Sequence, residues 1–411
     1  MNTKYIVLIP DGMADDPLKE LGGRTPLEAA GTPNMDALAG KGFVGRVCNV
    51  PVGMSPGSDV AVMSVLGYDP ARYHTGRAPL EAPAIGVDLK PGRIAYRMNL
   101  VTIADGQMAD FAAGHISSNE AAVLVEALQA TLGSNEFRFY PGTSYRHLLV
   151  TTDRDLLEMT CTPPHDIIGQ SIKTYLPSGL KAERLLDLMD RAEEILENHE
   201  INVLRKESGK NPANRIWFWG QGVRPEMPLF KDVFGITGAI ISAVPLLQSL
   251  AAYLGLERVH VDGITGYLDT NYSGKGKAAV EALKKHDFVC IHVEAPDEAG
   301  HSGDYQAKIE AIERIDRDVL GTVLDGLKHY DQWRILVLPD HPTPVTLRTH
   351  TSKPVPFVLC GTGIDPDSVD KMGESHARST GILIDKGHRL MEILLEKRSI
   401  DIRSGNKTGS I

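Results

Sequence analysis

A short apolar run that ends in an aspartate and a histidine constrains this chain more than any other feature. Residues 334–338 have the composition of a strand buried on both faces, and Asp340 and His341 follow after a single proline. In an open α/β sheet, ligands bind beyond the carboxyl ends of the strands. The sequence therefore predicts that both side chains project into a site at a strand end, where each could bind a divalent metal once deprotonated.

Two other predicted strands lead into residues of the same kind. Residues 5–9 form a buried strand that is followed by Asp11, although an Asp-Gly pair is also typical of a plain turn. The strand at 286–293 leads to Asp297 and His301, which are four residues apart and would share one face of a helical turn. The proline and glycine in that segment favour a loop or a single turn over a regular helix. Such a pair, taken alone, is also common on ordinary protein surfaces.

A serine opens another predicted helix. A Gly/Pro/Ser loop at 53–57 leads into a helix whose first turn holds Ser58 and Asp59. Helix N-termini offer free N–H groups and the positive end of the helix dipole, which favour phosphate. Ser58 is therefore either a simple N-cap or a nucleophile. With His350 nine residues after His341, the polar side chains suffice for two metals, which lie about 3.5 to 4 Å apart in phosphoryl-transfer sites.

The middle of the chain has a different pattern. Alternating segments at 93–102 and 144–150 predict strands of a mainly antiparallel or mixed sheet, with helices at 120–132 and 180–198 and an aromatic strand at 214–222. Buried strands alternating with helices resume at 236–244, 246–254, 277–285 and 286–293. The pattern predicts an α/β domain with a parallel sheet, built from residues 1–77 and 233–411, and a smaller inserted α+β domain at 78–232.

Composition limits the compartment and the partners. The formal net charge is −10 and no Lys/Arg-rich run is present, which argues against nucleic-acid binding; an anionic substrate would need a local cationic pocket or metals. The four cysteines are scattered without a C-x-x-C pair, so we expect free thiols in a reducing cytoplasm. No stretch approaches the roughly 18 apolar residues of a membrane span. The oligomeric state is left open by the sequence.

Several of these segments together resemble the alkaline phosphatase superfamily. More narrowly, the chain is similar over essentially its whole length to the cofactor-independent phosphoglycerate mutases of the archaeal type. The segments that carry this resemblance are PDG at 10–12, PGSD at 56–59, EAPDEAGH at 294–301, PDH at 339–341, RTHTS at 348–352, and RMNL at 97–100, AGHI at 113–116, SYRH at 144–147 and NPAN at 211–214 within the insert.

The resemblance implies a role for each of the polar residues described above. Ser58 would carry the phosphoryl group as a covalent intermediate. One metal would be held by Asp297, His301 and His350. The other would be held by Asp11, Asp340, His341 and the hydroxyl oxygen of Ser58. The family uses Mn²⁺, Zn²⁺ or Mg²⁺, and mixed histidine and carboxylate ligands suit manganese or zinc better than magnesium. No added 2,3-bisphosphoglycerate would be required.

The same resemblance implies that the insert closes over the α/β domain, grips a small phosphorylated substrate and excludes water. The side chains expected to bind this substrate are Arg97, Asn99, His115, Arg146 and His147 from the insert and Lys275 from the α/β domain. Arginine suits bidentate recognition of carboxylate or phosphate. The competing interpretation is that Arg146 and His147 form a surface or cross-strand pair and that Lys275 is a plain surface lysine.

The activity implied is interconversion of 2-phosphoglycerate and 3-phosphoglycerate through phospho-Ser58. The chain is also similar to bacterial relatives proposed to be homoserine kinases, so a phosphotransferase acting on homoserine is an alternative, as is a metal-dependent phosphomonoesterase. No P-loop or kinase-type glycine-rich loop is visible, which argues against an ordinary nucleotide site. A catalytically silent binding protein on the same scaffold would lack a metal ligand, whereas every expected position is filled here.

Overall fold

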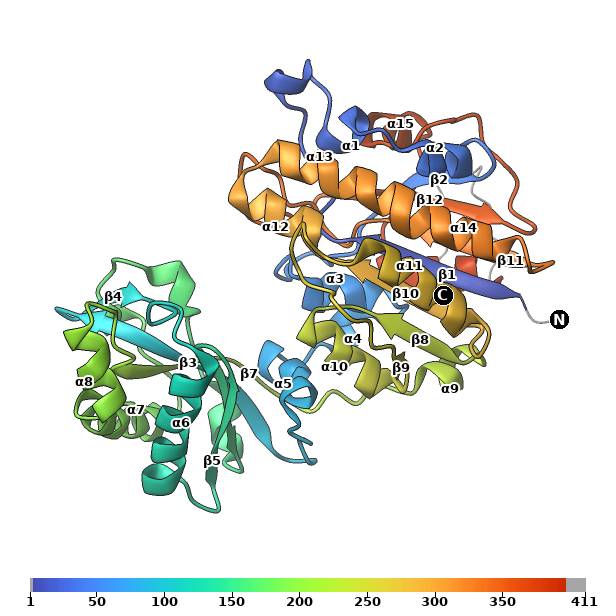
Figure 1. The fold of residues 1–411 in the computed structure, drawn as a ribbon. Coiled ribbons are helices and arrows are strands. Elements are labelled where there is room, and N and C mark those ends of the chain that lie inside the picture. The colour runs from blue at the N-terminus through green and yellow to red at the C-terminus, as the bar shows by residue number, and fades with distance from the viewer. Residues whose placement is uncertain (1–2, 397–411) are drawn as a thin grey trace. The chain divides into compact units, whose positions relative to one another are not determined.

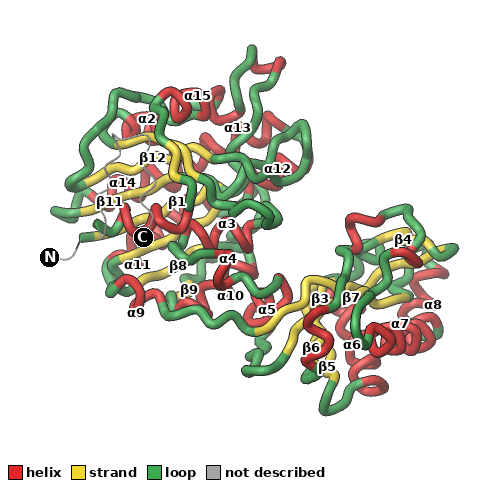
Figure 2. The backbone as a smooth tube through the Cα atoms, turned by 180° about the vertical axis from the view of Figure 1, so that it is seen from behind, coloured by secondary structure: helices red, strands yellow, loops and turns green. Residues whose placement is uncertain are grey.

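The computed structural model describes residues 3–396 and divides into two compact units. Unit 1 comprises Met1–Tyr73 and Met227–Ile411, and unit 2 comprises His74–Glu226. Figures 1 and 2 follow the chain through both. Composition alone suggested residues 78 and 232 as the boundaries of the insert, a few residues further along the chain.

Unit 1 is built on a sheet that has eight strands within the described residues. Neighbouring strands β11, β1, β10, β8 and β9 all run parallel, whereas β12 is antiparallel to both β11 and β2. In spatial order the strands are β13 Leu383–Ile384, β2 Phe43–Val47, β12 Val355–Gly361, β11 Trp333–Val337, β1 Lys4–Pro10, β10 Phe288–Val293, β8 Gly238–Ile241 and β9 Glu257–Arg258. The sheet is thus mainly parallel, as predicted, with one reversed strand.

Helices cover both faces of this sheet because the central strands are apolar on both sides. Ile6 and Leu8 of β1 belong to a core formed with α2 Pro33–Ala39, α11 Tyr272–Leu283, α13 Tyr305–Arg314, the π-helical segment Ile315–Leu320 and α14 Gly321–Leu327. Val7 and Ile9 alternate with them and are also fully buried, toward the opposite face. Helices α10 Pro245–Leu254 and α16 Leu390–Leu394 contact β8 and β11, and α3 Ser58–Val65 contacts α10.

The remaining helices of unit 1 are short. They are α1 Pro26–Ala29, α4 Pro70–Tyr73, α9 Phe230–Phe234, α12 Ala295–Ser302 and α15 Glu374–Ser379. Helix α12 corrects the expectation of a loop or single turn after β10. Its Pro296 lies in the first turn, where the missing N–H costs no hydrogen bond, and the helix ends at Gly303 in the left-handed conformation.

Four of the strands that direct their carboxyl ends to one edge of the sheet lead into the residues of interest. Strands β11, β1 and β10 are adjacent and parallel, so the residues that follow them meet at that edge. Strand β2 reaches the same edge because two successive antiparallel pairings, through β12, restore its direction relative to β11. The chain leaving β2 then leads to α3, and this brings the start of α3 to the edge where β1, β10 and β11 end.

Unit 2 has an antiparallel five-stranded sheet, as predicted for the insert. Helices α6 and α7 pack on one face against Tyr96, Met98 and Leu100, and α5 contacts β3 and β7. A capping box of Ser117 and Glu120 begins α6. The elements are β3 Ile94–Ala104, β4 Gln107–Asp110, β5 Phe137–Thr143, β6 Arg146–Thr151, β7 Arg215–Val223, α5 Arg77–Glu81, α6 Ser118–Leu132, α7 Ala182–Glu197 and α8 Glu200–Glu207.

Two general features complete the description. The four cysteines are free thiols, in line with the scattered spacing of the sequence. Within residues 3–396, none of the helices combines the length and the apolar composition needed to span a lipid bilayer.

Candidate functional site

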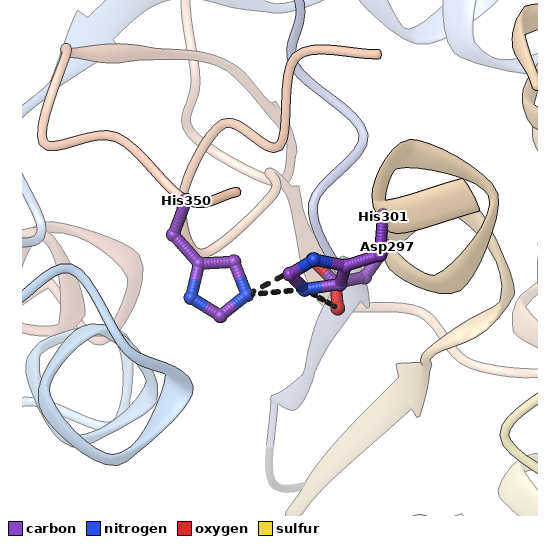
Figure 3. A group of neighbouring side chains, drawn as sticks. All are labelled: Asp297, His301 and His350. Carbon is purple, nitrogen blue, oxygen red and sulfur yellow. Dashed lines mark hydrogen bonds and ion pairs between the residues drawn. The ribbon is translucent and has the colours of Figure 1, made fainter. Parts of the chain in front are cut away.

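Three side chains from α12 and from the loop after β11 form the first possible metal site. We call Asp297, His301 and His350 the Asp297 group; one ligand atom of each lies within 4.8 Å of the others. The Nε2 atoms of the two histidines are 2.9 Å apart, and they lie 3.2 Å (His301) and 3.4 Å (His350) from the carboxylate oxygens of Asp297. Figure 3 shows the two rings turned toward each other beside this carboxylate. Helical spacing of four residues places Asp297 and His301 on one face of α12, as predicted.

Hydrogen bonds orient the histidine ring of His301 in the Asp297 group. His301 Nδ1 lies 3.0 Å from the carbonyl oxygen of Arg348, an acceptor, so Nδ1 carries a ring proton, and Nε2, which faces Asp297, could bind a metal once it loses its own proton. Burial opposes ionisation of Asp297, but its hydrogen bonds with both histidines hold the pKa of this carboxyl well below the usual range. The bond to Asp297 likewise raises the pKa of His301 to about 9. The group is therefore built around a permanent negative charge.

A second set lies at the ends of β1 and β11. We call Asp11, Asp340 and His341 the Asp11 group; all three side chains are fully buried. His341 Nε2 lies 3.3 Å from Asp340 Oδ2 and 3.6 Å from Asp11 Oδ1. The N–H groups of Gly12 and His341 donate to Asp340 Oδ1, which orients the carboxylate and leaves its other oxygen free.

The Asp11 group carries more negative charge than the protein around it neutralises. Burial, and then the neighbouring Asp340 carboxylate, raise the pKa of Asp11 well above its ordinary value. Asp11 Oδ1 and Asp340 Oδ2 are buried and have no hydrogen-bond partner. Unpaired buried carboxylate oxygens are costly unless a cation or donor joins them. The orphaned carboxylate oxygens and the converging histidine nitrogens therefore fit a pair of divalent cations, one in each group.

Ser58 lies beside the Asp11 group at the start of α3. Its Oγ is 3.2 Å from His341 Nε2. The N-cap of α3 is Gly57, so Ser58 occupies the first helical position and its side chain is not used as a cap. The N-cap alternative for Ser58 is therefore wrong. The hydroxyl is half-exposed, next to two buried carboxylates and the free N–H groups of a helix N-terminus, where a phosphoryl group can approach it.

His292 and Glu294 join the site although the sequence analysis did not include them. His292, in β10, is fully buried with Nε2 2.9 Å from Asp11 Oδ2 and Nδ1 3.3 Å from Ser242 Oγ. We assign its proton to Nε2, because the carboxylate can only accept a hydrogen bond. Glu294 follows β10 directly, at the position where Asp11 follows β1. That strand-end carboxylate was a usable signal, whereas a histidine inside an apolar strand gave none.

Lys275 is neither a surface lysine nor an exposed substrate ligand. It is fully buried on α11, and its ammonium donates to the carbonyl oxygen of His292 over 2.8 Å. Burial lowers the pKa of Lys275 to about 8, although the nearby Glu294 carboxylate opposes this. Lys275 therefore supports the strand that carries His292, and direct contact with a substrate does not fit its position.

Unit 2 carries a separate set of cationic and aromatic side chains on one face of its sheet. Arg97 stacks over the ring of Trp219 at 4.2 Å, and its Nε pairs with Glu81 at 2.9 Å. Arg146 is exposed and stacks on Tyr145 at 5.2 Å. We call Arg97, Arg146 and Trp219 the arginine face. Asn99 lies opposite Arg146 in the register of β3 and β6, and Arg97 lies opposite Trp219 in the register of β3 and β7. Asn99 is two residues from Arg97, so the side chains of all four residues project to the same side of the sheet.

The predicted substrate ligands of unit 2 are not all available. His115 is exposed, and its ring lies 6.1 Å from that of Tyr145. Asn99 is buried, donates to the carbonyl of Phe111 and accepts from Trp219 Nε1, so it orients the tryptophan. His147 lies opposite Met98 on the core side, is 2% exposed and accepts a bond from the Gly142 N–H. Direct substrate contact does not fit the burial of His147.

Charges from other elements extend the arginine face. Arg77 of α5 shares Glu81 with Arg97, and both Arg77 and Arg146 act with burial to lower the pKa of Arg97, which reaches about 10. The His165 ring lies 5.3 Å from that of Trp219. The Glu81 carboxylate thus pairs with two guanidinium groups, and arginines of this kind suit an anionic ligand. The sequence showed these arginines but not which of them converge.

Comparisons with known proteins identify relatives of this chain. The model of the family described as 2,3-bisphosphoglycerate-independent phosphoglycerate mutase matches residues 39–202. The chain is 51% identical over 399 residues to a probable 2,3-bisphosphoglycerate-independent phosphoglycerate mutase of Geobacter sulfurreducens, covering 96% of this chain and 100% of the relative. It is 50% identical over 394 residues to a 2,3-bisphosphoglycerate-independent phosphoglycerate mutase of Methanothermobacter thermautotrophicus, covering 96% and 97%.

A solved structure extends the similarity to the fold. A protein of Pyrococcus horikoshii superposes with a TM-score of 0.81 at 31% identity, covering all of both chains. Because half of the residues are identical to those of the Geobacter relative across the full length of that relative, this chain belongs to the 2,3-bisphosphoglycerate-independent phosphoglycerate mutase family.

Proposed function

We propose that this chain interconverts 2-phosphoglycerate and 3-phosphoglycerate through a phosphoserine at Ser58, without added 2,3-bisphosphoglycerate. The observation that carries the proposal is the placement of the Ser58 hydroxyl, 3.2 Å from His341 Nε2 at the N-terminus of α3. This placement supports the proposal because it gives a hydroxyl nucleophile beside the Asp11 group, whose side chains could hold a metal. The names of the relatives at about 50% identity support the substrate.

Two divalent cations are the cofactors that we propose, manganese or zinc before magnesium. The Asp297 group would hold one, and the Asp11 group with Ser58 Oγ would hold the other. When bound, such ions neutralise phosphate charge and lower the pKa of a coordinated hydroxyl. Mixed nitrogen and oxygen ligands favour manganese or zinc on ligand softness. With these charges balanced, a protein of net charge −10 can bind a phosphorylated acid.

The residues of the chain account for the transfer in two half-reactions. Ser58 Oγ loses its proton and attacks phosphorus, while the bond from phosphorus to the glycerate oxygen breaks and that oxygen takes up a proton. The N–H groups at the start of α3 lie where the phosphoryl oxygens would be. The other glycerate hydroxyl then gives up its proton and attacks phospho-Ser58, and the serine is regenerated. The two steps balance, with no net uptake of water or protons.

Retention of the glycerate is assigned to unit 2. We propose that Arg97 and Arg146 bind its carboxylate and that His115 contacts a hydroxyl. Arg97 is suited to this role because stacking on Trp219 and pairing with Glu81 hold its guanidinium in one orientation, so little entropy is lost on binding. Asn99 orients Trp219 by accepting a hydrogen bond from its Nε1.

The decisive experiment is a coupled assay on the full-length chain. Metal-free protein is supplied with Mn²⁺ and 3-phosphoglycerate, and formation of 2-phosphoglycerate is followed through enolase, with no bisphosphoglycerate present. Turnover that requires the ion supports the proposal. Release of inorganic phosphate instead would identify a phosphomonoesterase. Phosphorylation of homoserine by ATP, with no turnover of phosphoglycerate, would replace the mutase assignment by a kinase assignment.

A further inference from the structure

One threonine hydroxyl touches both groups of the proposed metal site. Thr343 lies two residues after His341 and is fully buried. Its Oγ1 donates a short hydrogen bond to Asp297 Oδ1, in the Asp297 group, and lies 3.3 Å from Nδ1 of His341, in the Asp11 group. The same oxygen therefore contacts one residue of each group, and in His341 the contacted Nδ1 is the other ring nitrogen from the Nε2 that lies near Ser58.

These two contacts determine which ring nitrogen of His341 carries the proton. A carboxylate can only accept, so the single proton of the Thr343 hydroxyl goes to Asp297. The oxygen then has only lone pairs left for His341, whose Nδ1 must carry the ring proton and donate it. Nε2 is left with a free lone pair, and this is the atom 3.2 Å from Ser58 Oγ and 3.3 Å from Asp340 Oδ2. Without the hydroxyl, nothing at Nδ1 would select this tautomer.

The backbone around Thr343 holds the hydroxyl in place. Its N–H donates to the carbonyl oxygen of Ala14, and its own carbonyl accepts a 2.8 Å bond from the fully buried Lys308. Two glycines close the space around the side chain. A Cβ on Gly12 would lie 2.6 Å from Thr343 Oγ1, and a Cβ on Gly300 would lie 2.8 Å from Thr343 Cγ2. The threonine cannot move far without displacing the loop at Gly12 or helix α12 at Gly300.

We propose that Thr343 is a positioning residue that sets the affinity of both metal groups at once, by orienting Asp297 and fixing the tautomer of His341. The inference deepens the proposed function and rests on its metal sites. Residues that orient metal ligands through hydrogen bonds typically change metal affinity by roughly 10- to 100-fold when they are removed. Loss of this hydroxyl therefore weakens both groups together.

The test is a Mn²⁺ titration of metal-free full-length protein, followed by calorimetry and by electron paramagnetic resonance. Thr343→Val keeps the shape of the side chain and removes the hydroxyl, and we expect both Mn²⁺ affinities to fall by roughly 10- to 100-fold. Thr343→Ser keeps the hydroxyl and should restore most of the affinity. Thr351→Val is the matched control, because it makes the same change in the same loop at a buried hydroxyl that has no hydrogen-bond partner.

The outcomes separate this inference from the proposed function. Wild-type protein that binds two Mn²⁺ ions, together with a Thr343→Val variant that titrates like Thr351→Val, would overturn the inference and leave the function standing. A loss confined to one of the two ions would also overturn it. Wild-type protein that binds no Mn²⁺ would refute both. If the valine variant does not fold, as judged by circular dichroism, Thr343→Ala should lose affinity and Thr343→Ser should keep it, and equal titrations of these two would refute the inference.

Discussion

The two units gather side chains of opposite charge. The strand-end edge of unit 1 gathers buried carboxylates, and Asp11 and Asp340 each keep an oxygen without a hydrogen-bond donor. The arginine face of unit 2 gathers guanidinium groups, and Arg97 and the neighbouring Arg77 share the carboxylate of Glu81. The difference teaches that one site is incomplete without cations and the other without an anion, so ligands should act on them separately.

The largest effect is expected when the proposed nucleophile is removed from unit 1 and unit 2 is left unchanged. Ser58→Ala should lower mutase turnover by about 10⁴-fold or more, because no other group can hold the phosphoryl in transit. The content of bound metal, measured by elemental analysis, should stay close to that of wild type. Ser55→Ala, an exposed serine in the same loop, is the control and should keep full activity. Turnover retained in Ser58→Ala would mean that another residue is the nucleophile.

Metal removal should affect one unit and spare the other. A cation that binds only the folded state stabilises it by about 2.7 kcal/mol when present at a hundred times its dissociation constant. Chelation should therefore increase amide hydrogen exchange in β1, β10 and β11 and leave β3, β6 and β7 unchanged. Comparable changes in the strands of both units would show that the sites are not energetically separate.

The arginine face should respond to substrate and not to metal. Arg97→Lys keeps the charge but loses the planar fork and the stacking on Trp219, so we expect KM to rise by roughly tenfold. The number of Mn²⁺ ions bound, and their affinity, should stay the same. Steady-state kinetics with both phosphoglycerates, beside a metal titration, would check this. A variant with unchanged KM would remove Arg97 from the proposed carboxylate site.

A smaller effect is expected when acid pH lowers the stability of unit 2. Burial lowers the pKa of His147 from 6.5 to about 3, so the unfolded chain takes up the proton more readily than the folded one. The stability contributed by the neutral ring is complete above about pH 6.5 and is lost as the pH falls toward 3. The slope approaches about 1.4 kcal/mol per pH unit at most.

His147→Asn offers an acceptor to the Gly142 N–H but cannot be protonated, so its unfolding should depend less on pH than that of wild type between pH 6 and 4. Tryptophan fluorescence in urea would follow this, since two of the three tryptophans, Trp217 and Trp219, lie in unit 2. Parallel pH profiles for the two proteins would show that the ring is not buried in its neutral form.

The sequence was informative wherever a strand ended. Buried runs followed by Asp11 and by Asp340 identified the edge of the sheet, and the four-residue spacing of Asp297 and His301 identified one face of α12. Local pattern sufficed because parallel strands bring their carboxyl ends together whatever the rest of the chain does. The predicted helix beginning near Ser58 was likewise confirmed.

Three features could not be deduced because they depend on distant partners. Alternation in β6 shows that Arg146 and His147 point to opposite faces, but not which of these two polar residues faces the core. The burial of Lys275 depends on β10 lying beneath α11. The reversed direction of β12 is fixed by its pairing with β11 and β2, which no local signal in the sequence records.

The central place of β1 has a consequence for synthesis on the ribosome. Its hydrogen-bonding neighbours, β10 and β11, begin at Phe288 and Trp333, so this apolar strand must wait for partners encoded far downstream. At roughly 5 to 20 residues per second, that delay lasts about 15 to 60 s. All strands of unit 2 are complete by Val223, so the insert can fold while its host is still unfinished. Protecting the nascent β1 from misassociation would then fall to chaperones or to the ribosome surface.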